Sequence, residues 1–112
     1  MENKINFEQF EQMKLRVGKI LEADRMEDTD KLIKLKVDLG EESSRQIVAG
    51  IARFYKEDEL EGRQVVVVAN LEPAELMGER SNGMVLCAHN EKEDECCLVE
   101  PEKDMELGTK VV

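Results

Sequence analysis

Basic and polar side chains that could bind phosphate are concentrated in two stretches of the chain. Residues 30–56 hold six basic and four acidic side chains, and the second stretch is the segment Arg80-Ser-Asn-Gly-Met84. Lysine and arginine attract phosphate, serine and asparagine donate hydrogen bonds to phosphate or a 2′-hydroxyl, and methionine offers an apolar contact to a sugar or base. The side chains of this kind that we single out are Lys31, Lys34, Lys36, Arg45, Arg80, Ser81, Asn82 and Met84.

The overall charge argues against a polyanionic partner, because the 112 residues carry a net charge of −10 and phosphate binding requires a basic surface. Residues 90–106 alone carry eight acids and two bases and so contribute −6 of that total. The balance of residues 30–56 is +2, which indicates where a polyanion could dock. The alternative is that these lysines form a solvated face with no ligand.

The search for catalytic groups predicts that the chain is not an enzyme. His89 has no serine or cysteine motif beside it, and the chain lacks glycine-rich cofactor and phosphate-loop signatures. The acidic run from Glu91 to Glu95 lacks the central glycine of a calcium loop. Cys87, Cys96 and Cys97 lack the spacing of a zinc or redox centre and are expected to be reduced and buried or half-buried. We therefore expect no catalytic residue, metal or cofactor.

A short helix and a strand are predicted at the start of the chain. Asn6, with Gln9 three residues later, has the spacing of a capping box, and Phe7 and Phe10 fall on one helical face. That face packs on the domain's own core or on a second subunit. The alternation of the next strand slips at Gly18, which predicts a bulge there.

The period-two pattern predicts four further main strands. Residues 33–39 place Lys34 and Lys36 outward, and residues 45–51 follow after a turn. A helical turn at 57–60, ended by Gly62, precedes residues 63–70, which are apolar on both faces and so form a central strand. A loop then leads through Ser81 to a strand at 84–89, and residues 96–99 form one more candidate strand.

This order predicts a mostly β chain that forms one five-stranded OB-fold barrel domain over residues 1–112, with a short N-terminal helix and a C-terminal extension. Sandwich and SH3-like barrels stay open on the pattern alone. OB barrels bind oligonucleotides on strands 2 and 3 and on the loops 1–2 and 4–5, where the basic residues would converge. Aromatic residues are scarce, which favours recognition of a folded RNA by shape over base stacking. The longest apolar run is residues 65–69, so we expect a soluble, cytoplasmic protein with no membrane contact.

Several motifs occur in an order that resembles the tRNA-binding domain family, which includes the C-terminal domain of methionyl-tRNA synthetase and free-standing relatives. They are Phe7-Glu-Gln-Phe10, Leu15-Arg-Val-Gly-Lys-Ile20, Asp30-Lys-Leu32, Leu35-Lys-Val-Asp-Leu-Gly40, Arg45-Gln-Ile-Val-Ala-Gly-Ile51, Asn70-Leu-Glu-Pro73 and Ser81-Asn-Gly-Met84. The resemblance implies recognition of tRNA by overall shape and a homodimer formed through the terminal segments. It places Ser81 and Met84 in an RNA-contacting loop, Asn70 at its entrance and Lys31 in the Asp-Lys-Leu motif. It assigns the dimer contact to Phe7, Phe10, Val111 and Val112.

We therefore expect a homodimeric tRNA-binding module that acts as, or together with, a methionyl-tRNA synthetase subunit to raise tRNA affinity in aminoacylation. The candidate partners are tRNA, a second copy of the chain and a synthetase catalytic chain. The first alternative is a peptide-binding export chaperone of the CsaA type, which resembles the same fold. The second is a protein–protein docking module whose acidic region makes the contact.

Overall fold

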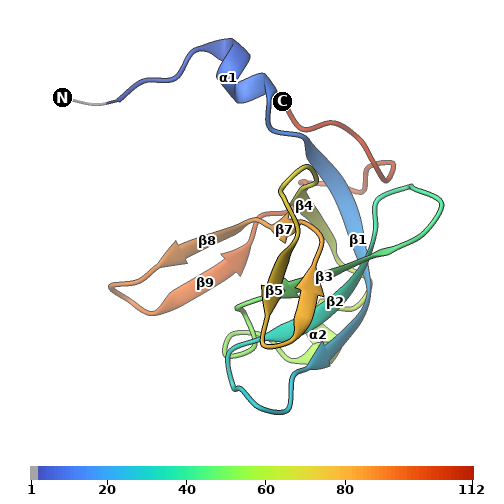
Figure 1. Ribbon diagram of the computed structural model, residues 1–112, viewed down its shortest axis with the longest axis vertical. Helices are drawn as coiled ribbons and strands as arrows, with labels where there is room; N and C mark the ends of the chain where they lie inside the picture. The colour runs from blue at the N-terminus through green and yellow to red at the C-terminus, as the bar shows by residue number, and fades with distance from the viewer. Residues whose placement is uncertain (1–2) are drawn as a thin grey trace.

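The computed structural model describes residues 3–112 and consists mainly of β-strands (Figure 1). A five-stranded antiparallel sheet has the order β3-β2-β1-β4-β7, and β7 also lies against β3, so the sheet curls into a barrel. The predicted five-stranded OB barrel is confirmed. Its strands are β1 (Leu15–Arg25), β2 (Ile33–Asp38), β3 (Arg45–Ala49), β4 (Gln64–Val68) and β7 (Met84–Val85). The other elements are α1 (Phe7–Glu11), α2 (Glu57–Leu60), β5 (Ala74–Leu76), β6 (Glu79–Ser81), β8 (Cys87–Asn90) and β9 (Glu95–Leu98).

The alternation of β2 orients this strand as the sequence predicts. Its apolar side chains Ile33, Leu35 and Val37 are fully buried inside the barrel, whereas Lys34 and Lys36 point outward. Successive side chains of a strand point to opposite faces, so the lysines cannot turn inward without exposing the core. We call the outer surface that carries Lys34 and Lys36 the lysine face.

Gly18 does not form the predicted bulge. β1 pairs with β4 in regular register through Gly18 and Val65, and the irregularity lies toward β2, between Ile20 and Glu22. A Cβ atom at Gly18 would come within 2.8 Å of the Leu39 side chain and 2.9 Å of the Val37 side chain. The glycine is therefore needed for close packing inside the barrel, and the prediction of a bulge at this residue was wrong.

β4 is buried on both faces, as predicted, because the barrel carries a second apolar cluster on its outside. Val65 and Val67 belong to the main core, whereas Val66 and Val68 pack with Leu15 in the second cluster. This outer cluster explains the slip in β1, because Leu15 faces outward and Ile20 faces inward. Half-buried side chains cover the cluster: Phe10, Leu86 and Val111.

The segment between β4 and β7 was predicted as a loop, but residues 74–81 form the hairpin β5–β6. Met77 and Gly78, which form its tip, have φ angles of 50° and 83°. Two consecutive positive φ angles are typical of tight two-residue hairpin turns. Gly78 is a usual turn residue, but Met77 stands where such turns prefer asparagine, aspartate or glycine, so the pair lacks the sequence signature of a hairpin.

The predicted strand at 84–89 is two strands. β7 pairs with β4, and β8 pairs with β9 in a hairpin that projects from the barrel (Figure 1). Between them, the Leu86 backbone N–H donates to Val66 and its carbonyl accepts from Val99. The chain therefore changes its pairing partner at Leu86.

α1 begins at the predicted capping box. The Asn6 side chain accepts from the Gln9 N–H, and the Gln9 side chain accepts from the Asn6 N–H, both at 2.9 Å. α1 and the C-terminus lie at the same end of the molecule (Figure 1). Within residues 3–112, the helices are all too short or too polar to cross a membrane.

Candidate nucleic-acid interface

The two basic side chains of the lysine face are each paired with an acid. The Lys34 ammonium lies 3.5 Å from a Glu79 carboxylate oxygen, and that of Lys36 lies 3.7 Å from Glu22. Both pairs are solvent-exposed, and such pairs contribute little to stability because water screens them. An incoming phosphate can therefore replace either carboxylate at small cost. A pocket of about 270 Å³ lies along this face, and Gln46 also lines it.

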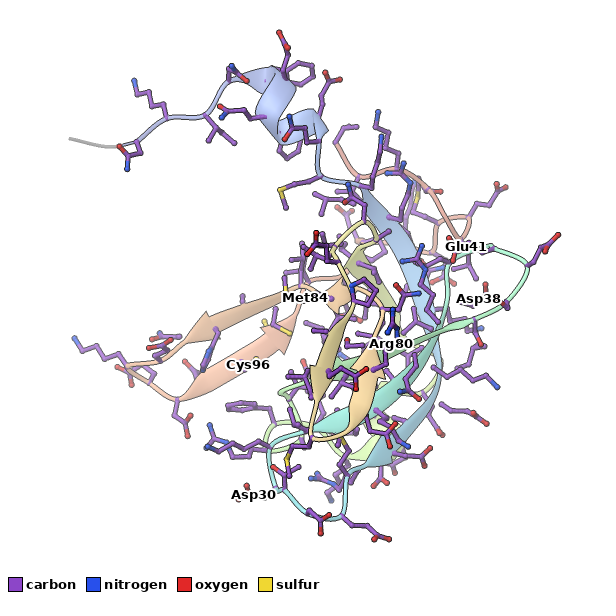
Figure 2. All side chains as sticks on the ribbon, viewed as in Figure 1. Asp30, Asp38, Glu41, Arg80, Met84 and Cys96 are labelled. Atoms are coloured by element: carbon purple, nitrogen blue, oxygen red, sulfur yellow. The ribbon has the colours of Figure 1, made fainter. Side chains whose placement is uncertain are left out.

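Lys31 and Arg80 lie on separate elements outside the lysine face. Lys31 lies in the loop between β1 and β2, and no acid among residues 3–112 is within ion-pair distance of its ammonium group. Arg80 projects from β6, and its guanidinium lies 3.9 Å from a carboxylate oxygen of Glu75 in a largely exposed pair. Figure 2 shows Arg80 near the centre of the view and Asp30, the neighbour of Lys31, at the bottom. These two cations lie at different places on the surface.

Asn82 and Met84 are exposed, as an RNA-contacting loop requires. The Asn82 backbone N–H donates to the carbonyl of Gln46 at 2.8 Å, which fixes the loop beside β3. Met84 is 46% exposed although it lies in a strand (Figure 2). Both side chains are therefore available to a ligand.

Ser81 is buried, unlike its neighbours in the loop. Its hydroxyl accepts a hydrogen bond from the Val48 N–H at 2.9 Å and donates one to the Gly83 carbonyl at 3.0 Å. These bonds tie β6 to β3 and shape the residue that follows Asn82. In this structure the Ser81 hydroxyl therefore serves the protein's own backbone.

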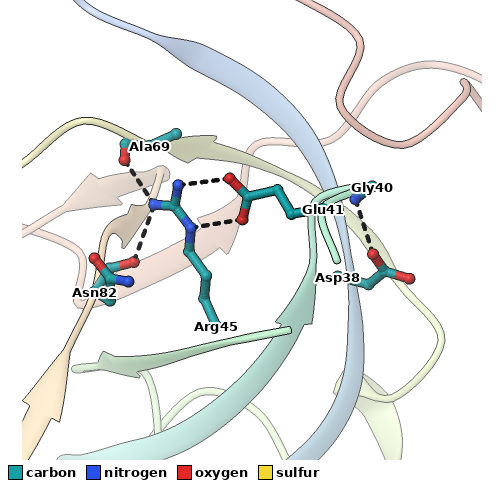
Figure 3. Close-up of polar contacts among 6 residues, drawn as sticks. All are labelled: Asp38, Gly40, Glu41, Arg45, Ala69 and Asn82. Atoms are coloured by element: carbon teal, nitrogen blue, oxygen red, sulfur yellow. Dashed lines mark hydrogen bonds and ion pairs between the residues drawn. The ribbon is translucent and has the colours of Figure 1, made fainter. Parts of the chain in front are cut away.

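Arg45 also lines the pocket along the lysine face, but its guanidinium is held by groups of the protein (Figure 3). It stands opposite the buried Val37 in the β2–β3 register. Its guanidinium makes two hydrogen bonds to Glu41, of 2.9 and 2.8 Å, and one of 2.6 Å to the Ala69 carbonyl. A longer bond of 3.4 Å reaches the carbonyl of Asn82. Arg45 thus links the start of β3 to the end of β4 and to the loop before β7.

The Arg45–Glu41 pair perturbs the titration of the carboxylate. Hydrogen bonds from the guanidinium and its positive charge lower the pKa of Glu41 below its ordinary value. The Arg45 side chain is only 18% exposed, whereas that of Glu41 is 46% exposed. The carboxylate is therefore the partner that has access to water and to competing anions.

Asn70 fastens the N-terminal segment to the barrel. Its side-chain oxygen accepts from the Lys14 N–H at 2.8 Å, and its amide donates to the Gln12 carbonyl at 2.7 Å. The oxygen and the NH2 group of this side chain thus both join the end of β4 to the residues between α1 and β1. The sequence did not indicate this role, because the two partners are more than fifty residues away.

The residues predicted for a dimer contact divide into two kinds. Phe10 and Val111 are half-buried against the outer apolar cluster. Phe7 is 70% exposed and Val112 is 89% exposed. The structure thus leaves apolar side chains uncovered at the end of the molecule where both terminal segments lie (Figure 1).

The cysteines occupy the projecting hairpin β8–β9. Cys87 and Cys96 are half-buried as predicted, but Cys97 is exposed because it points to the open side of this two-stranded hairpin. Burial, together with the nearby Cys96, raises the pKa of the Cys87 thiol to about 12. Within residues 3–112, no group of three His, Cys, Asp or Glu side chains is arranged to hold a metal ion.

Two basic residues that the sequence analysis did not single out, Lys14 and Arg16, line a further pocket together with Arg45. The only sequence signal for them is their alternation with Leu15 and Val17. The pattern was misleading because Leu15 and Val17, which face the outside of the barrel, have the apolar character expected of residues that face the core.

Comparison with known proteins gives a consistent result over nearly the whole chain. A family model described as "Putative tRNA binding domain" matches residues 15–110. The methionine–tRNA ligase of Archaeoglobus fulgidus is 49% identical over 107 residues, which are 96% of this chain and 16% of the ligase. The chain thus spans about a sixth of the length of the curated relatives that it matches.

Two solved structures share the fold over their full length. One is a methionyl-tRNA synthetase-related protein of Pyrococcus horikoshii, with a TM-score of 0.91 and 32% identity, covering 99% of this chain and 100% of that one. The other is the chaperone CsaA of Bacillus anthracis, with a TM-score of 0.87 and 32% identity, covering 98% of this chain and 100% of that one.

Proposed function

The chain belongs to the tRNA-binding domain family, and on this basis we propose that residues 1–112 form a non-catalytic domain that binds the body of tRNA. The family match over residues 15–110, together with the outward lysines of β2, is the observation that carries this proposal. The lysine face, Lys31 and Arg80 supply the phosphate contacts. Asn82 and Met84 contact sugar or base edges beside them.

Three of the predicted site residues, Arg45, Ser81 and Asn70, make hydrogen bonds to the protein's own backbone and have a positioning role in this proposal. Arg45 and Ser81 hold the loop that presents Asn82 and Met84, and they do so through bonds to the Asn82 and Gly83 carbonyls. Asn70 holds the N-terminal segment in place. In this proposal these three residues position the interface.

We place the domain in the cytoplasm as a homodimer that works as, or with, a methionyl-tRNA synthetase subunit. The exposed apolar side chains of Phe7 and Val112 support the dimer, because a subunit contact would remove them from water. Two copies would present two RNA surfaces, and the second contact would gain from its high effective concentration. The relationship to methionine–tRNA ligases supports the synthetase partner.

The alternative is a peptide-binding chaperone, which the structural similarity to CsaA favours. The assay that separates the two uses a denatured peptide together with tRNA as competitor. Peptide binding that tRNA does not displace would favour the chaperone. Displacement of bound peptide by tRNA, or no peptide binding, would favour the RNA-binding function.

The proposed function is tested with folded tRNA and an unstructured RNA of the same length, each titrated at low and moderate salt. We expect tRNA to bind more tightly than the unstructured RNA and to lose affinity as salt rises, because phosphate contacts release counterions. Absence of tRNA binding at low salt would contradict the proposal. Equal binding of the two RNAs would contradict recognition by shape.

The dimer is tested by Phe7→Asp, which places a charge on a residue that is 70% exposed and outside the barrel core. We expect light scattering to show a shift from dimer to monomer. Leu76→Asp is the matched control, because Leu76 is also exposed but lies on β5, away from the terminal segments. A Phe7→Asp protein that keeps the mass of the wild type would exclude this contact.

A further inference from the structure

One end of the barrel interior is lined by basic residues. The β1–β4 register places Arg16 opposite the buried Val67, two residues before Gly18 on the inner row. Because alternate residues of a strand share a face, Arg16 continues the inner row beyond the apolar core. Lys14 lies just before β1, where its carbonyl accepts from the Ala69 N–H at 2.8 Å, and it lines the same pocket as Arg16. Arg45 continues the inner row on β3, as its position opposite Val37 shows.

These three bases line a pocket of about 310 Å³, which we call the mouth pocket; its other lining residues are Leu39, Glu41, Ala69, Asn70 and Gly108. The C-terminal segment closes one side of it. A Cβ atom on Gly40 would lie 2.7 Å from the Leu107 carbonyl oxygen, and one on Gly108 would lie 2.8 Å from that of Leu39. Both glycines have positive φ angles. The two backbones therefore lie in direct contact, and the pocket has a built wall.

The charge of the mouth pocket is the reverse of that of the molecule. The pocket contains three basic side chains and one acid, Glu41, in a chain of net charge −10. No acid among residues 3–112 lies within ion-pair distance of Lys14 or Arg16. Concave, partly desolvated sites of one sign concentrate counterions more strongly than open surfaces do. The preferred ligand of this pocket is therefore an anion.

Glu41 indicates the shape of that anion. Its two carboxylate oxygens accept two parallel bonds from Arg45, at 2.9 and 2.8 Å. A phosphate group offers the same pair of oxygens and fits a guanidinium in the same bidentate way. Glu41 is also the more exposed partner of the pair, so it can leave while Arg45 stays bonded to the Ala69 carbonyl.

We propose that the mouth pocket binds a phosphodiester group of the RNA backbone, with Glu41 as an internal acceptor that the phosphate displaces from Arg45. This inference rests on the proposed tRNA-binding function and adds a second contact to it. The pocket lies on the inner row of β1 and β3, and the lysine face lies on the outer side of β2. A tRNA that reaches both surfaces contacts the mouth pocket at the end of the barrel and the lysine face along the side of the barrel.

The first experiment compares three neutralised variants, Lys14→Gln, Arg16→Gln and Glu41→Gln, by tRNA titration across salt. Lys92→Gln is the matched control, because Lys92 lies in the turn of the hairpin β8–β9 and carries the same charge. Loss of one phosphate contact lowers the salt slope by about 1 and weakens binding by roughly 3- to 10-fold, and we expect this for Lys14→Gln and Arg16→Gln. Glu41→Gln should tighten binding, and Lys92→Gln should match the wild type.

The second experiment tests anion binding by the mouth pocket without tRNA. Isotopically labelled protein is titrated with dimethyl phosphate, an anionic diester, and separately with inorganic phosphate, while backbone amide resonances are followed. We expect dimethyl phosphate to shift the amides of residues 14–16, Glu41, Arg45 and Gly108, and Lys14→Gln to abolish the shifts. Lys14 is exposed and outside any strand, so this variant tests the pocket even where Arg16→Gln fails to fold.

The outcomes separate the two proposals. Wild-type tRNA binding with mouth-pocket variants that behave like Lys92→Gln would overturn the mouth pocket and leave the proposed function intact. No tRNA binding by the wild type would overturn the function, while the dimethyl phosphate titration would still decide the pocket. Shifts with inorganic phosphate alone would mean a free-phosphate site and would overturn the assignment to a diester.

Discussion

The lysine face and the barrel end carry the same residue types, but the fold uses them in opposite ways. Lys36 is 53% exposed and has one ion-pair partner, Glu22, at 3.7 Å. Arg45 is 18% exposed and bonds to three partners on three segments. The difference follows from the strand pleat, because Lys36 occupies an outward position of β2 and Arg45 an inward position of β3. Location on the pleat, more than residue type, decides how many bonds a cation makes to groups of the protein itself.

The largest effect on stability is expected for Arg45→Met. This change keeps the apolar stem but leaves the Ala69 carbonyl without its donor and Glu41 without its counterion. Hydrogen bonds of charged groups each contribute about 1.5–3 kcal/mol, so we expect the free energy of unfolding in urea to fall by about 2–3 kcal/mol. Arg53→Met is the control, since its pair with Asp94 is exposed. Equal losses for both variants would remove the contrast between inward and outward cations.

Ser81→Ala should have the next largest effect. It leaves the buried Val48 N–H without an acceptor, and an unsatisfied buried donor costs about 1–3 kcal/mol. Thermal unfolding should show the loss, whereas Ser43→Ala, at an exposed turn position, should melt like the wild type. Unchanged melting of Ser81→Ala, with weaker tRNA binding, would instead make Ser81 a direct RNA contact.

The Arg45–Glu41 pair should give a smaller, pH-dependent effect. The pKa of Glu41 is lower in the folded chain than its ordinary value of 4.5, so its stabilisation is complete above that value and disappears as pH falls through the lowered pKa. Glu41 is exposed, so the pair contributes less than about 1 kcal/mol. The difference in unfolding free energy between wild type and Glu41→Gln should therefore shrink from pH 6 to pH 3. A constant difference would mean that the charge of Glu41 does not matter.

The parts of the fold that the sequence predicted are those governed by local rules. Alternation of apolar and polar residues identified β2, and Gly62 identified the end of α2. The spacing of Asn6 and Gln9 identified the N-terminal cap of α1. Each of these depends on residues close together in the chain.

The parts that the sequence did not predict depend on distant contacts. The fit of Gly18 against Leu39 and the switch of partner at Leu86 are set by strands far away in sequence. The candidate site divides in the same way. The outward direction of Lys34 followed from its own strand, whereas the bonds of Arg45 and Asn70 reach residues 24 and 56 positions away.

The most direct test of the account is a tRNA titration across salt with the double variant Lys34→Glu/Lys36→Glu beside the wild type. Both side chains are partly or largely exposed, so loss of the two ion pairs should lower the unfolding free energy by no more than about 1–2 kcal/mol. The tRNA affinity should fall by about tenfold or more, with a flatter dependence on salt. An affinity and salt slope equal to those of the wild type would mean that the lysine face is only solvated and would contradict the account.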